Sequence, residues 1–204
     1  MQVVEPRPVM AGMGRIRHIF MVGIGGAGMS GIAEVLAGLG YTVTGSDRAE
    51  SAVVARLRSL GITVHIGHEA EHIAGADVLV VSAAVPEDNP ERLAARQQRI
   101  PVVPRAEMLA ELMRYRFGIA VAGTHGKTTS SALAAHTLKV GAKDPSHYVG
   151  AEIPILGTNA NWDDSGEYFV AEGDESDGTL VNFHPEHAIL LNVEEEHLLS
   201  LIHI

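Results

Sequence analysis

The segment Gly123-Thr124-His125-Gly126-Lys127-Thr128-Thr129 combines glycines, a lysine and hydroxyl side chains at a spacing that suits phosphate binding. Glycines let backbone N–H groups face phosphate oxygens, and a helix that begins at such a loop adds the positive end of its dipole. Lys127 could then reach the outer phosphates, and the Thr128 hydroxyl could bind Mg²⁺. The commoner pattern has a further glycine where this chain has Val121. We interpret the segment as an ATP-binding loop; the alternative is an exposed turn that happens to contain Gly-Lys-Thr.

A second glycine-rich segment, Gly23-Ile24-Gly25-Gly26-Ala27-Gly28, matches the pattern G-x-G-x-x-G. Asp47 follows about twenty residues later, where dinucleotide-binding loops have an acidic residue that bonds a ribose. The pattern indicates that a diphosphate could lie at a helix N-terminus, and a UDP-sugar satisfies it as well as NAD does. The alternative is that these glycines serve only close packing between a helix and a strand.

Two acidic segments each follow an apolar run. They are Glu172-Gly173-Asp174-Glu175-Ser176-Asp177 and Glu194-Glu195-Glu196-His197. Taken alone, each could be a solvated acidic turn. In a parallel sheet, however, the carboxyl ends of the strands share one edge, so Glu172 and His197 should lie beside the ATP-binding loop. A threonine hydroxyl and a carboxylate suit Mg²⁺, although histidine is a less usual ligand for this ion.

The chain has 204 residues, a net charge of -10 and no cysteine. The negative charge argues against binding to nucleic acid or to an anionic membrane surface, because both would repel it. Without cysteine no disulfide or thiolate metal site can form, which fits a cytoplasmic protein. Glycines interrupt the first apolar run, so we expect neither a signal peptide nor membrane insertion. The spacing of His65, His68 and His72 is not that of a zinc site, and we expect these side chains to be hydrogen-bonded or exposed.

Short apolar runs alternate with segments of helical spacing in the first half of the chain, which predicts a parallel sheet covered by helices. We expect strands at residues 18–24, 41–45, 62–66, 78–81 and 101–103. We expect helices at residues 29–39, 52–59, 90–98 and 105–115. Residues 1–114 are therefore interpreted as a Rossmann-like α/β domain.

Residues 115–204 are interpreted as an incomplete P-loop α/β domain that binds ATP. We expect a strand at 117–122, the ATP-binding loop, a helix from about Lys127 to Val140 that ends at Gly141, and strands at 168–171 and 188–192. About three strands are too few for the sheet of such a domain, so we expect the chain to stop within it. The final residues are apolar and lack turn chemistry, and we hypothesise that they are not native.

With these features together, the chain resembles the Mur ligase family of peptidoglycan synthesis from about His18 to His197. The resemblance rests on six segments: GIGGAGMS at 23–30, Gly45-Ser46-Asp47, Pro104-Arg105-Ala106-Glu107, AGTHGKTT at 122–129, Gly157-Thr158-Asn159-Ala160, and residues 171–177. Two residues depart from the family pattern, Gly173 where the family has alanine and Glu196 where it has aspartate. From Leu198 onward the resemblance ends.

The resemblance implies that the first domain holds the UDP part of a substrate, the second holds ATP, and a third domain beyond Ile204 closes over an amino acid. It implies substrate contacts at Gly25, Gly26, Ala27, Gly28, Met29, Ser30, Asp47 and Ser82. It implies ATP contacts at Gly123, Thr124, His125, Gly126, Lys127, Thr128 and Thr129. Thr128, Glu172 and His197 would bind the metal, and Lys127, Glu172 and His197 would be catalytic.

The reaction implied by the resemblance is phosphorylation of the lactyl carboxylate of UDP-N-acetylmuramate by ATP, followed by attack of L-alanine on the acyl phosphate. Lys127 and Mg²⁺ would neutralise charge on the transferred phosphoryl group. Three alternatives remain: a family member that joins a recycled tripeptide to UDP-N-acetylmuramate, an NAD-dependent oxidoreductase, and a binding fragment without turnover. We expect little ligase activity from these 204 residues alone, because the implied adenine pocket lies beyond them.

Overall fold

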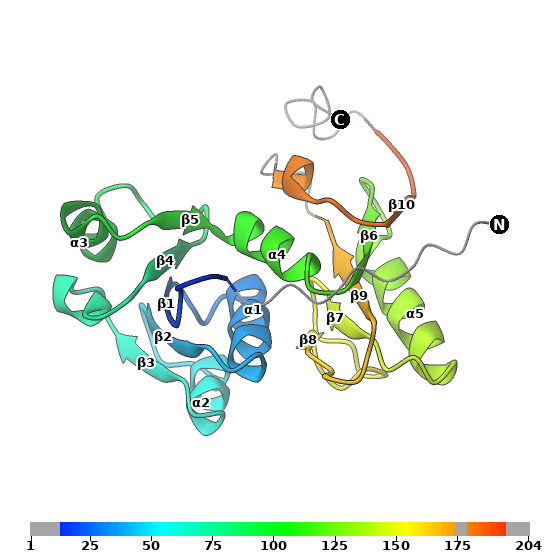
Figure 1. Ribbon diagram of the computed structural model, residues 1–204, viewed down its shortest axis with the longest axis horizontal. Helices are drawn as coiled ribbons and strands as arrows, with labels where there is room; N and C mark the ends of the chain where they lie inside the picture. Colours follow the sequence, from blue (N-terminus) through cyan, green and yellow to red (C-terminus); the bar gives the residue numbers. More distant parts are fainter. Residues whose placement is uncertain (1–12, 174–178, 195–204) are drawn as a thin grey trace. The chain divides into compact units, whose positions relative to one another are not determined.

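The computed structural model describes residues 13–173 and 179–194, which form two compact units (Figure 1). The described residues up to Met108 belong to the first unit and those from Leu109 onward to the second. The sequence-based boundary lies a few residues later, after residue 114. Each unit contains its own five-stranded sheet.

The first unit is built on a parallel sheet with the strand order β3-β2-β1-β4-β5. The strands are β1 (His18–Val22), β2 (Thr42–Asp47), β3 (Thr63–Ile66), β4 (Val78–Val81) and β5 (Val102–Pro104). The helices are α1 (Ala27–Gly38), α2 (Ala52–Ser59), the 3-10 helix η1 (Ala70–Ile73), α3 (Pro90–Gln98) and α4 (Arg105–Met113), which contains the boundary between the units. The predicted parallel α/β architecture is confirmed. The strand order reverses between β1 and β4, and open sheets of this kind bind ligands at that reversal, beside the carboxyl ends of the strands.

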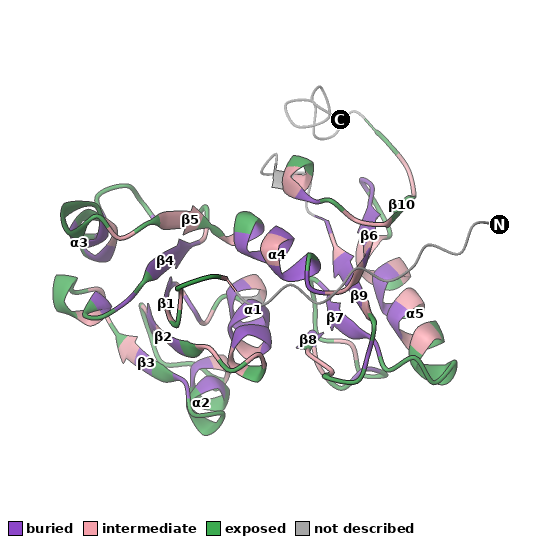
Figure 2. Cartoon of the chain, in the orientation of Figure 1, coloured by how far each residue is buried: buried purple, intermediate pink, exposed green. Residues whose placement is uncertain are grey.

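The central strands of this sheet form the core of the first unit. Ile19, Phe20, Met21 and Val22 of β1 are fully buried, and all four residues of β4 are buried as well (Figure 2). Continuous apolar strands are typical of parallel sheets with both faces covered, which is why these strands could be recognised from sequence. The central strands therefore contribute apolar side chains to the core.

The second unit has the strand order β10-β6-β9-β7-β8, in which only the β7–β8 pair is antiparallel. The strands are β6 (Phe117–Ala122), β7 (Ser146–Tyr148), β8 (Ala160–Asn161), β9 (Tyr168–Glu172) and β10 (His187–Leu190). The helices are α5 (Lys127–Val140) and the 3-10 helix η2 (Thr179–Asn182). Val121, Ala132, Ala135, Val149 and Val170 form its buried cluster. The predicted helix after the 123–126 loop, with Gly141 as its C-cap residue, is confirmed.

The prediction of about three strands for the second unit was wrong, because β7 and β8 were missed. These strands are three and two residues long and include Ser146, His147 and Asn161, so they carry no apolar alternation. Backbone pairing of β7 with β9 holds them in the sheet. The argument from strand number for an incomplete sheet therefore fails. The final residues, which we hypothesised to be non-native, lie outside the described part of the chain.

No helix in the described residues is both long enough and apolar enough to cross a membrane.

Candidate functional site

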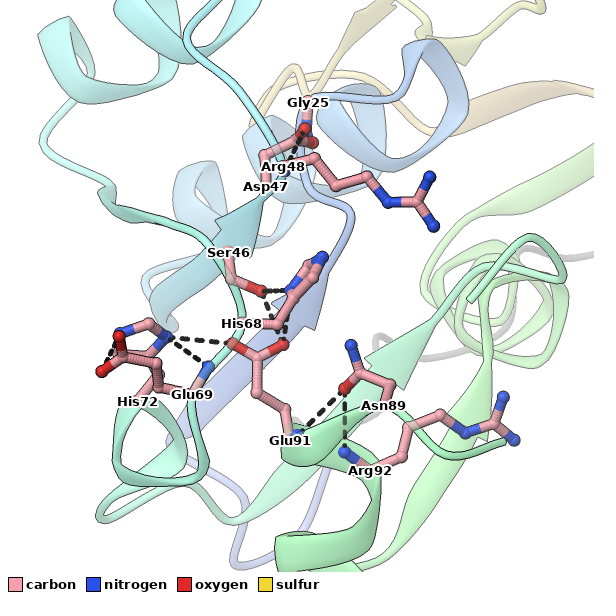
Figure 3. A network of polar contacts seen from close by, with 10 residues as sticks. All are labelled: Gly25, Ser46, Asp47, Arg48, His68, Glu69, His72, Asn89, Glu91 and Arg92. Atoms are coloured by element: carbon pink, nitrogen blue, oxygen red, sulfur yellow. Dashed lines mark hydrogen bonds and ion pairs between the residues drawn. The ribbon is translucent and has the colours of Figure 1, made fainter. Parts of the chain in front are cut away.

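The first glycine loop, residues 23–28, connects β1 to α1 and is held by the end of β2. The Ser46 carbonyl oxygen accepts hydrogen bonds from the N–H groups of Gly23, at 2.8 Å, and Ile24, at 3.0 Å. The Asp47 carboxylate oxygen Oδ2 accepts a hydrogen bond from the Gly25 N–H at 2.7 Å (Figure 3). A β-carbon at Gly25 would lie 2.8 Å from that same oxygen. The close approach between loop and carboxylate therefore requires glycine at this position.

A cavity of about 670 Å³ lies beside this loop, at the carboxyl ends of the strands. This volume is in the range of small-molecule sites. Of the predicted substrate contacts, Gly25, Gly26, Asp47 and Ser82 line the cavity. Ala27 and Gly28 begin α1. Met29 and Ser30 are only 2% and 4% exposed and do not line the cavity, so their side chains belong to the packing of α1.

The polar residues that line the cavity include several that the sequence interpretation missed, among them Arg48, His68 and Asn89. Arg48 follows the last residue of β2, His68 comes two residues after β3, and Asn89 is the N-cap residue of α3. A position just after a strand or just before a helix at the binding edge of the sheet was the signal that could have identified them.

The second glycine loop, residues 123–126, connects β6 to α5. Gly123 and Gly126 have φ angles of +137° and +85°, which residues with a β-carbon rarely adopt. Gly126 is the N-cap residue and provides no side-chain acceptor to the first helical turn, which also contains no acidic residue. The Lys127 ammonium donates hydrogen bonds to the carbonyl oxygens of Gly123, at 2.7 Å, and Thr124, at 3.2 Å. The lysine thus lies over its own loop, at the positive end of α5.

Glu172, the last residue of β9, lies next to this loop, as the sheet-edge argument predicts. The Thr128 hydroxyl donates a hydrogen bond to Glu172 Oε1 at 3.1 Å, and the Gly150 N–H donates one to Oε2 at 2.7 Å. A hydroxyl and a carboxylate in contact are hard oxygen donors of the kind that Mg²⁺ prefers. His197 lies outside the described residues. Within the described residues no group of three or more His, Cys, Asp or Glu side chains could hold a metal ion.

Asn192, beside the second glycine loop, is a further residue that the sequence interpretation missed, since it was read only as the end of a strand. Its side-chain oxygen accepts a hydrogen bond from the His125 N–H at 2.9 Å, and its amide nitrogen donates one to the His125 carbonyl oxygen at 3.1 Å. Its own carbonyl oxygen accepts a hydrogen bond from the Thr124 N–H at 3.3 Å. Asn192 therefore holds the backbone on both sides of His125, at the centre of the second glycine loop.

The sequence of this chain is similar to a known protein family and to named members of it. A family model described as "Mur ligase family, catalytic domain" matches residues 18–117. The UDP-N-acetylmuramate–L-alanine ligase of Halorhodospira halophila is 58% identical over 185 residues, which are 91% of this chain and 38% of that protein. The ligase of the same name from Rhodopseudomonas palustris strain BisB18 is 59% identical over 183 residues, 90% of this chain and 39% of that protein. The chain belongs to the Mur ligase family.

Solved structures agree with this assignment. The UDP-N-acetylmuramate–alanine ligase of Thermotoga maritima superimposes with a TM-score of 0.82 at 33% identity, over 92% of this Mur ligase chain and 44% of that chain. A UDP-N-acetylmuramate:L-alanyl-gamma-D-glutamyl-meso-diaminopimelate ligase from Neisseria meningitides gives a TM-score of 0.83 at 28% identity, over 90% and 62% of the two chains. The Mur ligase chain spans about 38% of the length of the curated relatives that it matches.

The contacts of Asn192 lead to a prediction for this Mur ligase chain. Replacing Asn192 by alanine removes both side-chain hydrogen bonds to His125. We expect the affinity for Mg-ATP, the ligand that the sequence of this loop predicts, to fall about tenfold or more, because two hydrogen bonds of about 1 kcal/mol each no longer hold the loop. Isothermal titration calorimetry measures the change. The matched control is Asn161→Ala, at an exposed asparagine of β8 in the same unit. Equal affinities of the two variants would show that the loop keeps its form without Asn192.

Proposed function

We propose that this chain is the UDP-sugar-binding and ATP-binding part of an enzyme that joins L-alanine to UDP-N-acetylmuramate in peptidoglycan precursor synthesis. The observation that carries the proposal is the contact of Thr128 with Glu172 next to Lys127, at the N-terminus of α5. The names of the relatives at 56–59% identity support the choice of substrates. Because the proposed reaction consumes ATP, we place it in the cytoplasm.

In this proposal the second unit is a P-loop domain, and residues 123–129 bind the phosphates of ATP. Thr128 and Glu172, together with His197, would hold Mg²⁺, which would supply positive charge to the phosphates. Lys127 would leave the carbonyl oxygens of Gly123 and Thr124 for the outer phosphates, so that its charge is placed where negative charge develops during transfer. The transfer goes to the lactyl carboxylate of UDP-N-acetylmuramate, and the L-alanine amine then displaces phosphate.

The cavity of the first unit would hold the UDP part of the substrate. The loop that starts at Gly23 leads into the N-terminus of α1, where a diphosphate is favoured. Asp47 keeps the loop in place through the Gly25 N–H, and its carboxylate faces the same cavity. We propose that the substrate also contacts Gly26, Ala27, Gly28, Met29, Ser30 and Ser82. Met29 and Ser30 are buried, so they would contact it through the backbone only.

Calorimetry tests this proposal on the chain as it stands. We expect UDP-N-acetylmuramate and Mg-ATP to bind independently and NADH not to bind. Chelation of Mg²⁺ should weaken ATP binding at least about tenfold, because the phosphates lose a charge partner, while leaving UDP-N-acetylmuramate binding unchanged. Tight binding of NADH without binding of UDP-N-acetylmuramate would favour the oxidoreductase alternative and overturn the proposal.

The specific alternative within the family is a ligase that adds the tripeptide instead of L-alanine. The structural similarity to the Neisseria tripeptide ligase keeps this alternative open. A protein that carries the full length of the relatives, assayed for ADP release with L-alanine and with the tripeptide, distinguishes the two. A higher kcat/KM for the tripeptide would contradict our choice of amino acid.

A further inference from the structure

A carboxylate is buried beneath the cavity of the first unit without a permanently charged partner. Glu91, in the first turn of α3, is 0% exposed. Its Oε2 atom accepts a hydrogen bond from the Ser46 hydroxyl at 2.7 Å and lies 2.9 Å from His68 Nδ1, and its Oε1 atom lies 3.1 Å from His72 Nδ1 (Figure 3). Among the described residues these are its side-chain partners, and none is an arginine or lysine. His72 Nδ1 also accepts a hydrogen bond from the Glu69 N–H at 3.3 Å, so His68 is the imidazole placed to donate a proton to Glu91.

His68 connects this buried carboxylate to the cavity. Its ring is partly exposed, lines the cavity and carries Nδ1 on the side of Glu91. Figure 3 shows the second ring nitrogen, Nε2, on the opposite side of the ring. An ionised carboxylate can only accept hydrogen bonds, so Glu91 requires the Nδ1 proton. In the neutral ring Nε2 is then an acceptor, whereas in the imidazolium it is a donor.

Whether His68 Nε2 accepts or donates a hydrogen bond matters because of the charges that line the cavity. Three carboxylates, Asp47, Glu50 and Asp88, line the cavity with one guanidinium, that of Arg48, and of the three Glu50 is paired with Arg58 at 2.8 Å. An anionic diphosphate would be repelled by this lining unless additional donors compensate. A protonated His68 would add one positive charge and one N–H donor at the cavity surface.

We propose that His68 contacts the ligand in this cavity, that Glu91 is the residue that positions it, and that ligand binding is coupled to the uptake of one proton from solvent onto His68 Nε2. The inference rests on the proposed function, because it takes the ligand to be the UDP part of a UDP-sugar. Glu91 holds the ring so that the new N–H group points into the cavity, toward phosphate oxygens. Affinity therefore rises as the solution is acidified from pH 8 to pH 6, the range in which imidazoles change charge.

The other groups around His68 differ from it in chemical class or in their position relative to the cavity. Carboxylates and guanidinium groups, as classes, keep their charge between about pH 6 and pH 8. His72 lies behind Glu91, on η1, and His65 of β3 stacks on it with ring centroids 4.2 Å apart. Burial, and then the neighbouring His72, lower the pKa of His65, which disfavours the protonated form of that ring. Neither histidine lines the cavity.

The test is calorimetric titration with UDP-N-acetylmuramate at pH 6, 7 and 8, in pairs of buffers with different ionisation enthalpies. The diphosphate of this ligand is a diester, so the ligand itself does not titrate in this range. We expect the wild-type affinity to be about tenfold higher at pH 6 than at pH 8, since hydrogen bonds to charged groups are roughly twice as strong as neutral ones. Buffer comparison should show uptake of up to one proton per ligand.

Two variants test whether Glu91 acts by positioning His68 or only by stabilising the fold. His68→Asn keeps a polar group near Glu91 but has no nitrogen at the cavity surface, so we expect weaker binding at pH 6 and no pH dependence. Glu91→Gln keeps the size of the side chain but removes the charge, and we expect a reduced pH dependence with His68 still present. The control is His18→Gln, at the amino end of β1, which should bind as the wild type does. Mg-ATP affinity, which belongs to the second unit, should be the same in all of them.

The outcomes distinguish this inference from the proposed function. Ligand binding that is independent of pH in the wild type, or a pH dependence that survives His68→Asn, overturns the inference and leaves the proposed function intact. A folded wild-type chain that does not bind UDP-N-acetylmuramate at any of the three pH values overturns the proposed function, and the inference with it. If the Glu91→Gln variant does not fold, the pH dependence of ligand binding by the His68→Asn variant tests the inference by itself.

Discussion

Replacing Lys127 by methionine should lower the kcat of phosphoryl transfer about a hundredfold to a thousandfold, the usual effect of removing one preorganised donor from a developing negative charge. Methionine keeps most of the length of the side chain but not the ammonium group, which lies at the N-terminus of α5 and donates to the carbonyl oxygens of Gly123 and Thr124. The loss should appear in kcat more than in the binding of UDP-N-acetylmuramate, because the lysine belongs to the other unit. The assay is L-alanine-dependent ADP release by a protein that carries the full length of the relatives.

The matched control for this variant is Lys139→Met, in the last turn of the same helix. Its side chain is exposed, so removing that charge should leave kcat unchanged. On the chain of 204 residues, Lys127→Met should also weaken Mg-ATP binding, while Lys139→Met should not. Normal turnover by Lys127→Met would show that the loop of residues 123–129 is not the site of phosphoryl transfer.

The largest expected effect on stability is that of Gly45→Val, in the middle of β2. A β-carbon at Gly45 would lie 2.4 Å from the carbonyl oxygen of Met21, its neighbour in β1, and 2.8 Å from Ile24 Cδ1. The oxygen cannot move away easily, because β1 is paired on both sides, with β2 and β4. We expect the free energy of unfolding of the first unit to fall by about 3 kcal/mol or more, at the upper end of overpacking effects.

Hydrogen exchange of the β1 and β2 amides measures this change in the first unit separately from the second. The control is Gly141→Ala, where φ is −76° and the nearest atoms to the new β-carbon are 3.4 Å away. That substitution should change stability little. Unchanged protection of β1 and β2 in Gly45→Val would show that the two strands can separate locally without cost.

The parts of the fold that were predicted correctly depend on local sequence. The strands β1 and β4 were recognised because both faces of their sheet are covered, so each is a short run of buried apolar residues. The helix α5 was recognised because the glycine loop precedes it and Gly141 follows it. In β7 and β8 the local signal is absent, since backbone pairing rather than apolar side chains holds them in place.

The candidate sites divide in the same way. Sequence alone determined the two glycine loops and Glu172, because the backbone conformation of such loops restricts the residue types and because parallel strands place their carboxyl ends together. Only the tertiary structure decided which side chains meet them. Asn192 reaches His125 across 67 positions in the chain, and Glu91 reaches Ser46 across 45. Hydrogen bonds between such distant residues leave no periodic pattern in the sequence, because they are set by how the elements pack and not by the local conformation of either segment.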